Sequence, residues 1–363
     1  MLFDRKGNLH IHTTCSDGSG SHEQVAEAAG QAGLSWVIVT DHNAAPLDEQ
    51  RWRGAVLMLI GQELHDPAHP HRNHLLVLGA HVDLAPLAAD IALALARAAE
   101  AGACCIIAHP YEHSGAYANE PEIDWQRWDL VDRVHGLEQW NYMSEFKAHL
   151  PNRLQALALA FWPQLAIVGP YAETLARWDA LLAERPCVGL GGSDAHAVEY
   201  TLGPLRRRVF SYRHLFGAVN THALVEGDWS GEVDADEGRL LDALRAGRCY
   251  VAYDGLREGT GFRFALHEPA GHVVHMGATA TWPVDGELVV RTPARARIEL
   301  WRNGHVCAST LGRRLNWPLR EPGVYRVVAR RRYACRWRAW LISNAIRILD
   351  TRDQGVGANL ASS

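Results

Sequence analysis

The sequence lacks several features that would place it in a membrane, secreted or metal-thiolate class. No window approaches about eighteen uninterrupted apolar residues, and the stretch 89–109 is broken by Arg97 and Glu100, so we predict no membrane span. Residues 1–8 hold no apolar signal-peptide core. The seven cysteines form no CxxC pair. Reduced, mostly buried thiols are typical of a cytoplasmic protein, and this is the localisation we predict.

An excess of either charge is also missing. The chain carries 36 basic and 41 acidic residues, for a formal charge of −5. This balance argues against a surface that coats nucleic acid, although it leaves room for a local basic pocket. We therefore expect a small-molecule substrate, with no membrane partner and no nucleic acid beyond nucleotides or short oligonucleotides. The oligomeric state stays open.

Histidine, in contrast, is abundant. There are 20 histidines, and most precede residue 200. The segment "GNLHIHTTCSDGS" places His10 and His12 two residues apart on a predicted strand, with Asp17 in the loop beyond. Residues i and i+2 of a strand face the same side, so both imidazoles point the same way. A divalent cation is one explanation, and a pair of core histidines bonded to backbone carbonyls is the other.

Strand-like and helix-like stretches alternate over the first 200 residues, which predicts an α/β fold with a parallel sheet or barrel. Helices are expected over 21–33, 87–102, 152–161 and 171–183. Polar residues recur at the carboxyl ends of the apolar runs, which is where (β/α) barrels place their chemistry. From about residue 257 the pattern changes to short alternating strands, with a hairpin signal at Asn303-Gly304. We predict a barrel over 1–256, a small all-β sandwich over 257–350 and a loose tail over 351–363.

The polar residues at these strand ends form one candidate set of nitrogen and oxygen ligands. It is too large for one ion and suits two or three. Its members are His10, His12, Asp17, His42, Glu63, His74, His109, Asp194 and His196.

This set, in the motifs "HIH", "SDG", "TDHN", "GQE", "NHLLVLG", "IAHP" and "GSDAH", resembles the polymerase and histidinol phosphatase (PHP) superfamily over residues 7–255. The resemblance implies a distorted (β/α)₇ barrel that binds two to three divalent ions, Zn, Mn or Fe. The C-terminal strands look like the β domain of the carbaryl-hydrolase-like branch. The implied ligands are His10, His12, Glu63 and Asp194 for a first ion, Glu63, His74 and His109 for a second, and Asp17, His42 and His196 for a third.

The predicted activity is metal-dependent hydrolysis by a hydroxide between two ions, most simply of a small phosphorylated metabolite or a nucleotide. His196 and Asp17 are the catalytic candidates for protonating the leaving group, but each is also an implied ligand, so the acid is unassigned. Candidate substrate contacts are Arg206, Tyr111 and His113. Two alternatives stay open: a carbamate or carboxyl ester hydrolase on the same centre, and a non-catalytic module stabilised by metal.

Two further observations concern neighbours of the motifs. Glu138 and Asn141, at the end of a predicted strand, are expected to orient ligands rather than bind metal. His65, His69 and His71 lie on a predicted loop outside the motifs, and we expect them to be rim residues.

Overall fold

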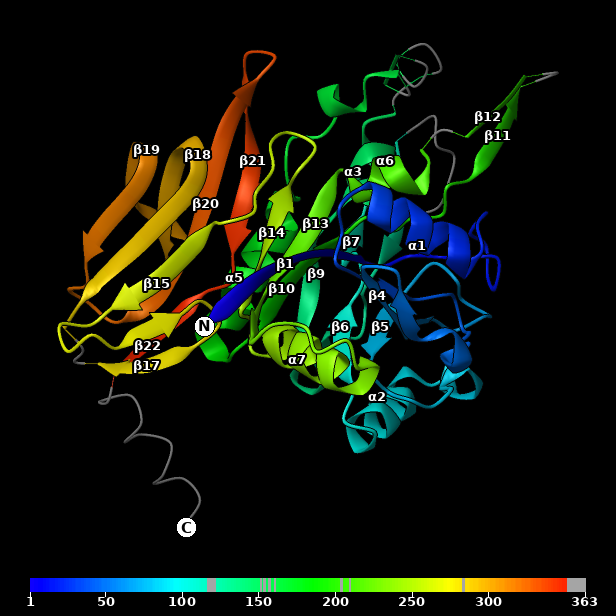
Figure 1. Cartoon of the computed structure of the whole chain (residues 1–363), viewed down its shortest axis with the longest axis horizontal. Coiled ribbons are helices and arrows are strands. Elements are labelled where there is room, and N and C mark those ends of the chain that lie inside the picture. The colour runs from blue at the N-terminus through cyan, green and yellow to red at the C-terminus, as the bar shows by residue number, and fades with distance from the viewer. Residues whose placement is uncertain are drawn as a thin grey trace.

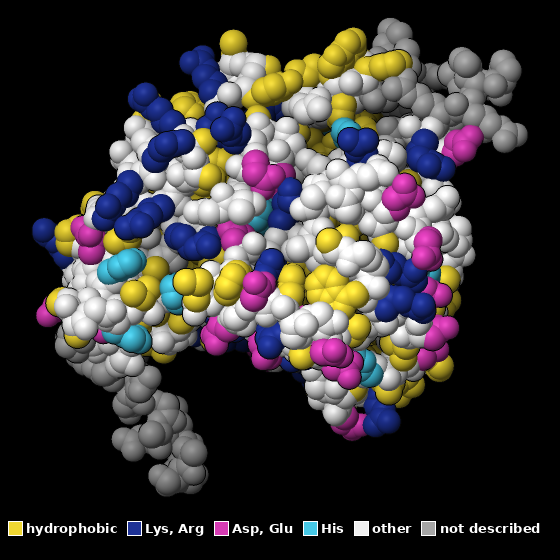
Figure 2. All heavy atoms as spheres, viewed as in Figure 1, with side chains coloured by type: hydrophobic (Ala, Val, Ile, Leu, Met, Phe, Trp, Pro, Cys, Tyr) yellow, Lys and Arg dark blue, Asp and Glu magenta, His cyan; other side chains and the backbone are white. Residues whose placement is uncertain are grey.

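The computed structural model describes residues 1–115, 122–150, 152, 155, 158–159, 161–202, 205–208, 210–282 and 285–350, with the side chains of 200–202 and 205–207 excluded. The fold is mixed α/β, as predicted. In Figure 1 the C-terminal strands stand at the left and the N-terminal strands and helices at the right. Lys and Arg side chains gather over the C-terminal strands on the face shown in Figure 2.

The N-terminal part is built from short strands separated by helices. Its strands are β1 (Leu2–Leu9), β2 (Trp36–Val39), β3 (Arg51–Arg53), β4 (Val56–Leu64), β5 (Leu75–Leu78), β6 (Cys104–Ile107), β7 (Tyr111–Glu112), β8 (Ile123–Asp124), β9 (Gly136–Asn141), β10 (Val188–Gly192), β11 (Glu199–Leu202), β12 (Leu205–Arg208), β13 (Val219–Glu226) and β14 (Cys249–Tyr253). Its α-helices are α1 (His22–Gln31), α2 (Ile91–Glu100), α3 (Tyr142–Ala148), α5 (Ala172–Glu184), α6 (Tyr212–Phe216) and α7 (Val233–Arg245). Its 3₁₀ turns are η1 (Leu47–Glu49), η2 (Ala85–Leu87), η3 (Trp128–Arg133) and η4 (Pro163–Leu165).

Local sequence explains where α1 begins and ends. The Ser21 hydroxyl accepts from the Gln24 backbone N–H while the Gln24 side chain bonds back to Ser21, a capping box. Gly33 stops the helix with φ of 71°, a conformation that favours glycine. The predicted helix over 152–161 falls largely outside the described residues.

The strand pairing brings the polar strand ends together. β1, β2 and β4 are parallel, and so are β6, β9 and β10. Beyond β10, the Ala195 N–H donates to His10 O (3.0 Å) and the His12 N–H donates to Ala195 O (2.9 Å), which links the last of these strands back to the first. The carboxyl ends of these strands therefore lie at one edge.

β5 runs antiparallel to both of its neighbours, β4 and β6. Its first residues consequently lie at the edge where the neighbouring strands end. This explains why His74 precedes its strand, whereas the other candidate ligands lie at or beyond the carboxyl ends of theirs.

The C-terminal strands are β15 (Arg263–His267), β16 (Val273–His275), β17 (Thr279–Trp282), β18 (Glu287–Arg302), β19 (His305–Pro318), β20 (Gly323–Tyr333), β21 (Arg336–Ser343) and β22 (Ile346–Asp350). The hairpin between β18 and β19 is confirmed: Asn303 and Gly304 have φ of 49° and 78°, which the tight turn requires.

Hydrogen bonds and ion pairs fasten the C-terminal strands to the N-terminal part. β21 pairs with β14. The buried guanidinium of Arg326 lies 2.6 Å from Asp179 of α5, and Arg338 donates to the carbonyl of Ile167. Trp340 is fully buried in the core that these strands form with Leu224 of β13 and Tyr250 of β14. The boundary at residue 256 stays a prediction, and 351–363 lies outside the described residues.

No described helix is long and apolar enough to cross a membrane. All seven cysteines are unpaired, and four of them are buried.

A buried charged cluster joins β1, β13 and the end of β14. The two ring nitrogens of His222 each lie 3.1 Å from a carboxylate, one of Asp4 and one of Asp254. Burial alone would lower the pKa of His222, but these carboxylates outweigh it and raise the pKa to about 9.

The free energy of unfolding is therefore expected to decrease as pH rises and His222 loses its proton. An unfolded histidine has a pKa of about 6.5, so the contribution of His222 is complete below that value and is lost as pH approaches 9. A pKa difference of this size corresponds to about 3 kcal/mol. Urea unfolding at pH 6, 7.5 and 9 should show this decline, and His222→Gln should show a flatter profile. Comparing the two chains separates His222 from buried thiols such as Cys104, whose pKa burial raises to about 12. Identical profiles would contradict the assignment.

Candidate metal centre

All nine candidate ligands lie at the edge where β1, β2, β4, β6 and β10 end and β5 begins. Glu63 is at the middle. Its Oε2 lies 3.0 Å from His10 Nε2, 3.2 Å from His12 Nε2 and 3.1 Å from His42 Nδ1. Its Oε1 lies 2.7 Å from His74 Nδ1 and 3.2 Å from His109 Nε2. Each oxygen of this one carboxylate thus faces its own set of imidazoles.

Asp194 closes the first of these sets. Its Oδ1 lies 3.4 Å from His10 Nε2 and 3.3 Å from His12 Nε2. Together with Glu63 Oε2, these atoms bring two imidazoles and two carboxylates together in a buried space. They are the four residues that the resemblance implies for a first ion.

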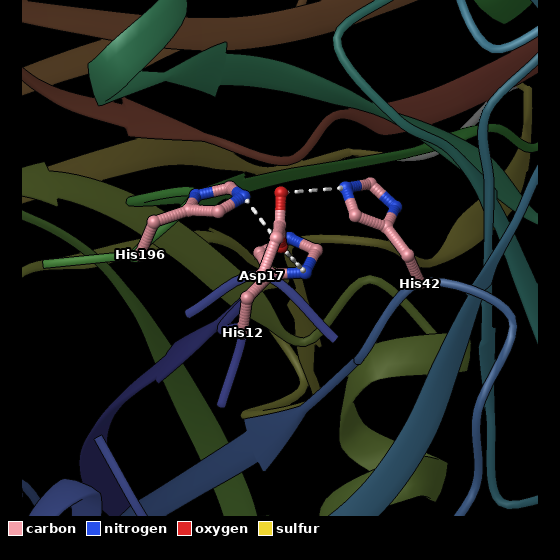
Figure 3. A group of neighbouring side chains, drawn as sticks. All are labelled: His12, Asp17, His42 and His196. Carbon is pink, nitrogen blue, oxygen red and sulfur yellow. Dashed lines mark ion pairs between the residues drawn. The ribbon is translucent and has the colours of Figure 1, made fainter. Parts of the chain in front are cut away.

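Three candidate ligands, Asp17, His42 and His196, lie toward solvent. Asp17 stands among His12, His42 and His196, as Figure 3 shows. Its carboxylate lies 3.7 Å from His12 Nδ1, 3.8 Å from His42 Nε2 and 3.2 Å from His196 Nε2. The Asp17 side chain is 57 % exposed, so this group forms the mouth of the site.

Several buried atoms of the cluster suit a cation better than hydrogen bonds. Within the described part of the chain, His10 Nε2, both ring nitrogens of His12, and Glu63 Oε2 have no hydrogen-bond partner. Ligand atoms that share one ion at about 2.1 Å stand roughly 3 Å apart, which is the spacing seen around Glu63. Imidazole and carboxylate are ligands that Zn, Mn and Fe accept. The residues present fit two or three such ions.

The tautomer of His74 also favours a bound cation. Its Nε2 lies 3.0 Å from the carbonyl oxygen of Pro70, which can only accept, so the proton is on Nε2. The Nδ1 lone pair then faces Glu63 Oε1. Two acceptors this close require a proton or a cation between them.

The pKa shifts of these residues show how strongly their charges act on one another. Burial would raise the pKa of Glu63, yet the surrounding histidines, His10 first, hold it well below its usual range. Burial would lower the pKa of His12, but the nearby carboxylates of Asp194 and Glu63 raise it to about 9. The pKa of His42 falls to about 3, mainly through burial. Ionised carboxylates therefore lie at the centre of the site, where they can offset the charge of bound cations.

A further layer of residues orients the ligands. Glu138 Oε2 lies 3.2 Å from His10 Nδ1 and accepts from the His109 backbone N–H (3.0 Å) and the Asn141 side chain (2.9 Å). When His10 donates its Nδ1–H to Glu138, the Nε2 lone pair of His10 points at Glu63 and Asp194. Glu138 contacts two candidate ligands directly and Asn141 contacts Glu138, and the orienting role of both stays a prediction.

The backbone at the site is strained. His10 and Asp194 have φ of 66° and 53°, although neither is a glycine. Such conformations are rare for these residues and concentrate at functional sites. Gly192 allows the close approach of this segment to β1, because a Cβ there would lie 2.4 Å from the carbonyl oxygen of Leu9.

His65 is closer to the cluster than the sequence suggested. Its ring stacks on His74 at 4.6 Å between centroids and meets His42 edge-on at 4.8 Å. The Asn43 side chain holds its backbone, accepting from His65 N and donating to His65 O. The signal was present, since His65 comes two residues after Glu63 and just after β4 ends.

The structure places two of the three predicted substrate contacts, Tyr111 and His113, with their side chains. Tyr111 lines a narrow cavity that also includes His109, and its ring stacks on Trp128. His113 is paired with Glu173 and packs against Tyr171. Arg206 lies on β12, and its side chain is outside the described residues. All three roles remain predictions.

Asp41 fixes the loop that carries Asp17. Its carboxylate is fully buried and accepts from the Thr13 N–H (2.7 Å), the Thr13 hydroxyl (2.7 Å) and the Ser16 hydroxyl (2.6 Å). Asp41 is therefore a positioning residue for the outer candidate ligands, acting through Thr13 and Ser16.

Replacing Asp41 by alanine should lower the occupancy of the outer position while sparing the inner ones. Each buried donor left unpaired costs about 1–3 kcal/mol, and the loop that holds Asp17 loosens. Metal content per chain by mass spectrometry, after dialysis at limiting metal, should fall by about one ion. Asp66→Ala, which removes a carboxylate from the neighbouring exposed loop, is the control. Full occupancy at unchanged affinity in Asp41→Ala would refute this role.

Comparison with known proteins finds solved structures that are only distantly similar to this chain. No family model and no curated protein matches the chain. A two-domain protein of Bacteroides vulgatus that contains a predicted PHP-like metal-dependent phosphoesterase is 13 % identical, with 94 % of this chain and 95 % of that one covered and a TM-score of 0.43. A candidate metal-dependent phosphoesterase of Bifidobacterium adolescentis is 16 % identical over 55 % of this chain and 91 % of its own, with a TM-score of 0.33.

A third similar structure is an amidohydrolase of Chromobacterium violaceum with bound sulfate and no metal. It is 13 % identical over 52 % of this chain and 87 % of its own, with a TM-score of 0.27. These three TM-scores lie below 0.5, and the assignment of the site follows from its own residues and distances.

Proposed function

We propose that this chain is a metal-dependent hydrolase of the PHP superfamily that acts on a small phosphoester. The observation that carries the proposal is the position of Glu63, whose two oxygens face separate sets of histidines at 2.7–3.2 Å. A carboxylate placed in this way can bridge two cations. The motifs of the superfamily resemblance support the same reading.

The proposal extends to architecture. We take the circuit of β1, β2, β4, β5, β6, β9 and β10 as the distorted (β/α)₇ barrel, and the strands from β15 onward as the C-terminal β-sandwich. The linkage of Ala195 to His10 and His12 supports closure of the circuit. The buried, unpaired cysteines support a reducing compartment, for which we propose the cytoplasm.

His10, His12, Glu63 and Asp194 would hold the first ion, Glu63, His74 and His109 the second, and Asp17, His42 and His196 the third. Bound divalent ions lower the pKa of water, so that hydroxide is available at neutral pH, and they offset the charge of a phosphoryl group. The chain itself supplies orientation: Glu138 fixes His10, and the Pro70 carbonyl fixes His74. Burial of the inner ligands keeps bulk water from screening these charges.

His196 and Asp17 face solvent at the mouth, 3.2 Å apart. A substrate that enters from solvent meets these two side chains first, so its leaving group would depart past them. Either could supply a proton there, but both belong to the ligand set. We therefore propose that they shape the leaving-group side and leave the acid unassigned.

A carbamate or carboxyl ester hydrolase is the second candidate. The cavity beside His109 has three aromatic side chains in its wall, Tyr111, Trp140 and Tyr171, which are the kind of surface that an apolar acyl or aryl group contacts. Its volume of about 10 Å³ has room for about one water molecule, so such a group would have to open it. Phosphoester hydrolysis is placed first because a centre with ligands for up to three cations matches the charge of a phosphoryl group.

A substrate screen tests the proposal directly. Nucleoside monophosphates and p-nitrophenyl phosphate are compared with aryl carbamates and carboxyl esters, each with Mn²⁺, Zn²⁺ and Fe²⁺. We expect phosphate release to exceed the other activities by at least tenfold in kcat/KM and to vanish in Glu63→Gln. Faster carbamate turnover would favour the second candidate. Metal-loaded protein with no turnover on any substrate would indicate a non-catalytic module.

A further inference from the structure

The positive charge of the chain is concentrated in its C-terminal strands. Residues 287–350 contain fourteen arginines and four acidic residues, a formal charge of +10. Since the whole chain carries −5, the remaining residues carry −15. The net charge conceals this division. Figure 2 shows basic side chains spread over these strands with few acidic ones between them.

Structural roles account for only some of these arginines. Arg326, Arg338 and Arg347 are buried and bond to the N-terminal part, to Asp179, Ile167 O and Leu182 O. A second group points outward from one side of the sheet, across β19, β18 and β20. This group, the basic face, consists of Arg291, Arg295, Arg297, Arg314, Arg330 and Arg332.

Strand register sets arginines of the basic face directly opposite one another. Arg291 of β18 pairs with Arg314 of β19, and Arg297 of β18 pairs with Arg330 of β20. Like charges in directly opposite positions destabilise a sheet. Glu299 lies 3.0 Å from both Arg297 and Arg330, so one carboxylate serves two guanidinium groups.

The other pair, Arg291 and Arg314, has no such carboxylate between its two guanidinium groups. No described carboxylate lies within ion-pair distance of Arg291, Arg314 or Arg332. A free protein would be more stable without this repulsion, so the arrangement favours an anionic partner that supplies the missing negative charge.

Aromatic side chains lie beside the basic face. At the β20–β21 hairpin, Trp337 is directly opposite Arg332, and Tyr333 begins the turn. Each of these aromatic side chains is 39 % exposed, which is uncommon for large rings. Guanidinium groups for a phosphate backbone together with exposed rings for stacking match the chemistry of single-stranded nucleic acid.

We propose that the basic face binds single-stranded nucleic acid, with Trp337 stacking on a base. This goes beyond the proposed hydrolase activity and does not depend on the metal centre. A polymer suits the observations better than a lipid surface, because the arginines extend across three strands while the exposed rings are confined to one end. From net charge alone we expected no nucleic acid beyond nucleotides or short oligonucleotides. The proposal differs from this expectation because the two parts of the chain carry opposite charge.

The test is fluorescence anisotropy with a labelled thymidine 20-mer whose phosphorothioate links resist hydrolysis. The variant R291Q/R314Q/R332Q is compared with R51Q/R97Q/R127Q, which removes three arginines from exposed sites of the N-terminal part. We expect the first variant to bind at least tenfold more weakly and the second to bind like the native chain. Loss of three phosphate contacts should reduce the slope of log K against log salt by about 2.

Trp337→Ala separates stacking from charge. It should weaken binding about fivefold or more while leaving the salt slope unchanged. The thermal midpoint of R291Q/R314Q/R332Q should equal or exceed that of the native chain, because a repulsive pair is removed, and this shows that the variant is folded.

Three results would overturn the proposal. The first is equal binding by both triple variants. The second is binding of polyglutamate as tight as that of the oligonucleotide, which would mean unspecific attraction of anions. The third is tighter binding to phosphatidylglycerol vesicles, lost in the first variant, which would assign the basic face to lipid.

Discussion

Glu63→Gln is expected to release at least two metal ions and to reduce hydrolysis by far more than any other single change. The substitution keeps the size of the side chain but removes the charge that both sets of histidines face at 2.7–3.2 Å. Loss of a residue that only orients a ligand typically costs 10–100-fold in affinity or activity, so loss of a shared ligand should exceed about 100-fold. Metal content by mass spectrometry and kcat on the best substrate of the screen measure the two effects.

Glu237→Gln is the matched control. Glu237 is also buried, but it lies on α7, bonded to Gln50 and outside the nine ligands. This control should keep its metal and its activity. Both variants should keep the native circular dichroism spectrum, because the apolar cores do not depend on the ions as a zinc finger does. Equal metal content in Glu63→Gln and Glu237→Gln would contradict the bridging assignment.

Trp340→Ala is expected to cause the largest loss of stability of any single substitution in the C-terminal strands. Trp340 is fully buried, and its indole N–H donates to the carbonyl of Arg257 at 2.5 Å. Removing a buried tryptophan costs about 3–5 kcal/mol through lost burial and the cavity left behind. Urea unfolding should report this decrease. Metal content should stay unchanged, because none of the described residues beyond 256 forms a hydrogen bond or ion pair with the nine ligands.

Trp337→Ala provides a control three residues away on the same strand. Its ring is 39 % exposed, so the free energy of unfolding should change by less than about 0.5 kcal/mol. If the two tryptophan variants lost stability equally, the packing of β21 against the core would be wrong. Loss of metal in Trp340→Ala would mean that the C-terminal strands support the site directly.

Much of the site could be predicted from the sequence because its residues lie at the ends of apolar runs that form strands. His10, Asp194 and Glu63 follow apolar runs, and parallel strands end at one edge, so their proximity follows from the pattern. The start of α1 was equally readable, since Ser21 and Gln24 form a capping box.

Other features depend on direction and register, which a single sequence does not reveal. His74 joins the site only because β5 runs antiparallel to its neighbours. His65 looked like a loop residue, and its position depends on the side-chain hydrogen bonds of Asn43. The opposition of Arg291 and Arg314 depends on pairing across a hairpin in which the register shifts between Arg291 and Ala296. A register change of one residue would have placed these side chains on opposite sides of the sheet.

Anomalous diffraction from crystals grown with Mn²⁺ or Zn²⁺ tests the central claim most directly. The account predicts two or three ions within the nine-ligand cluster, with Glu63 coordinating two of them and His10 and His12 sharing one. Metal-loaded protein in which the cluster gives no anomalous peak and His10 and His12 turn away from Glu63 would contradict it.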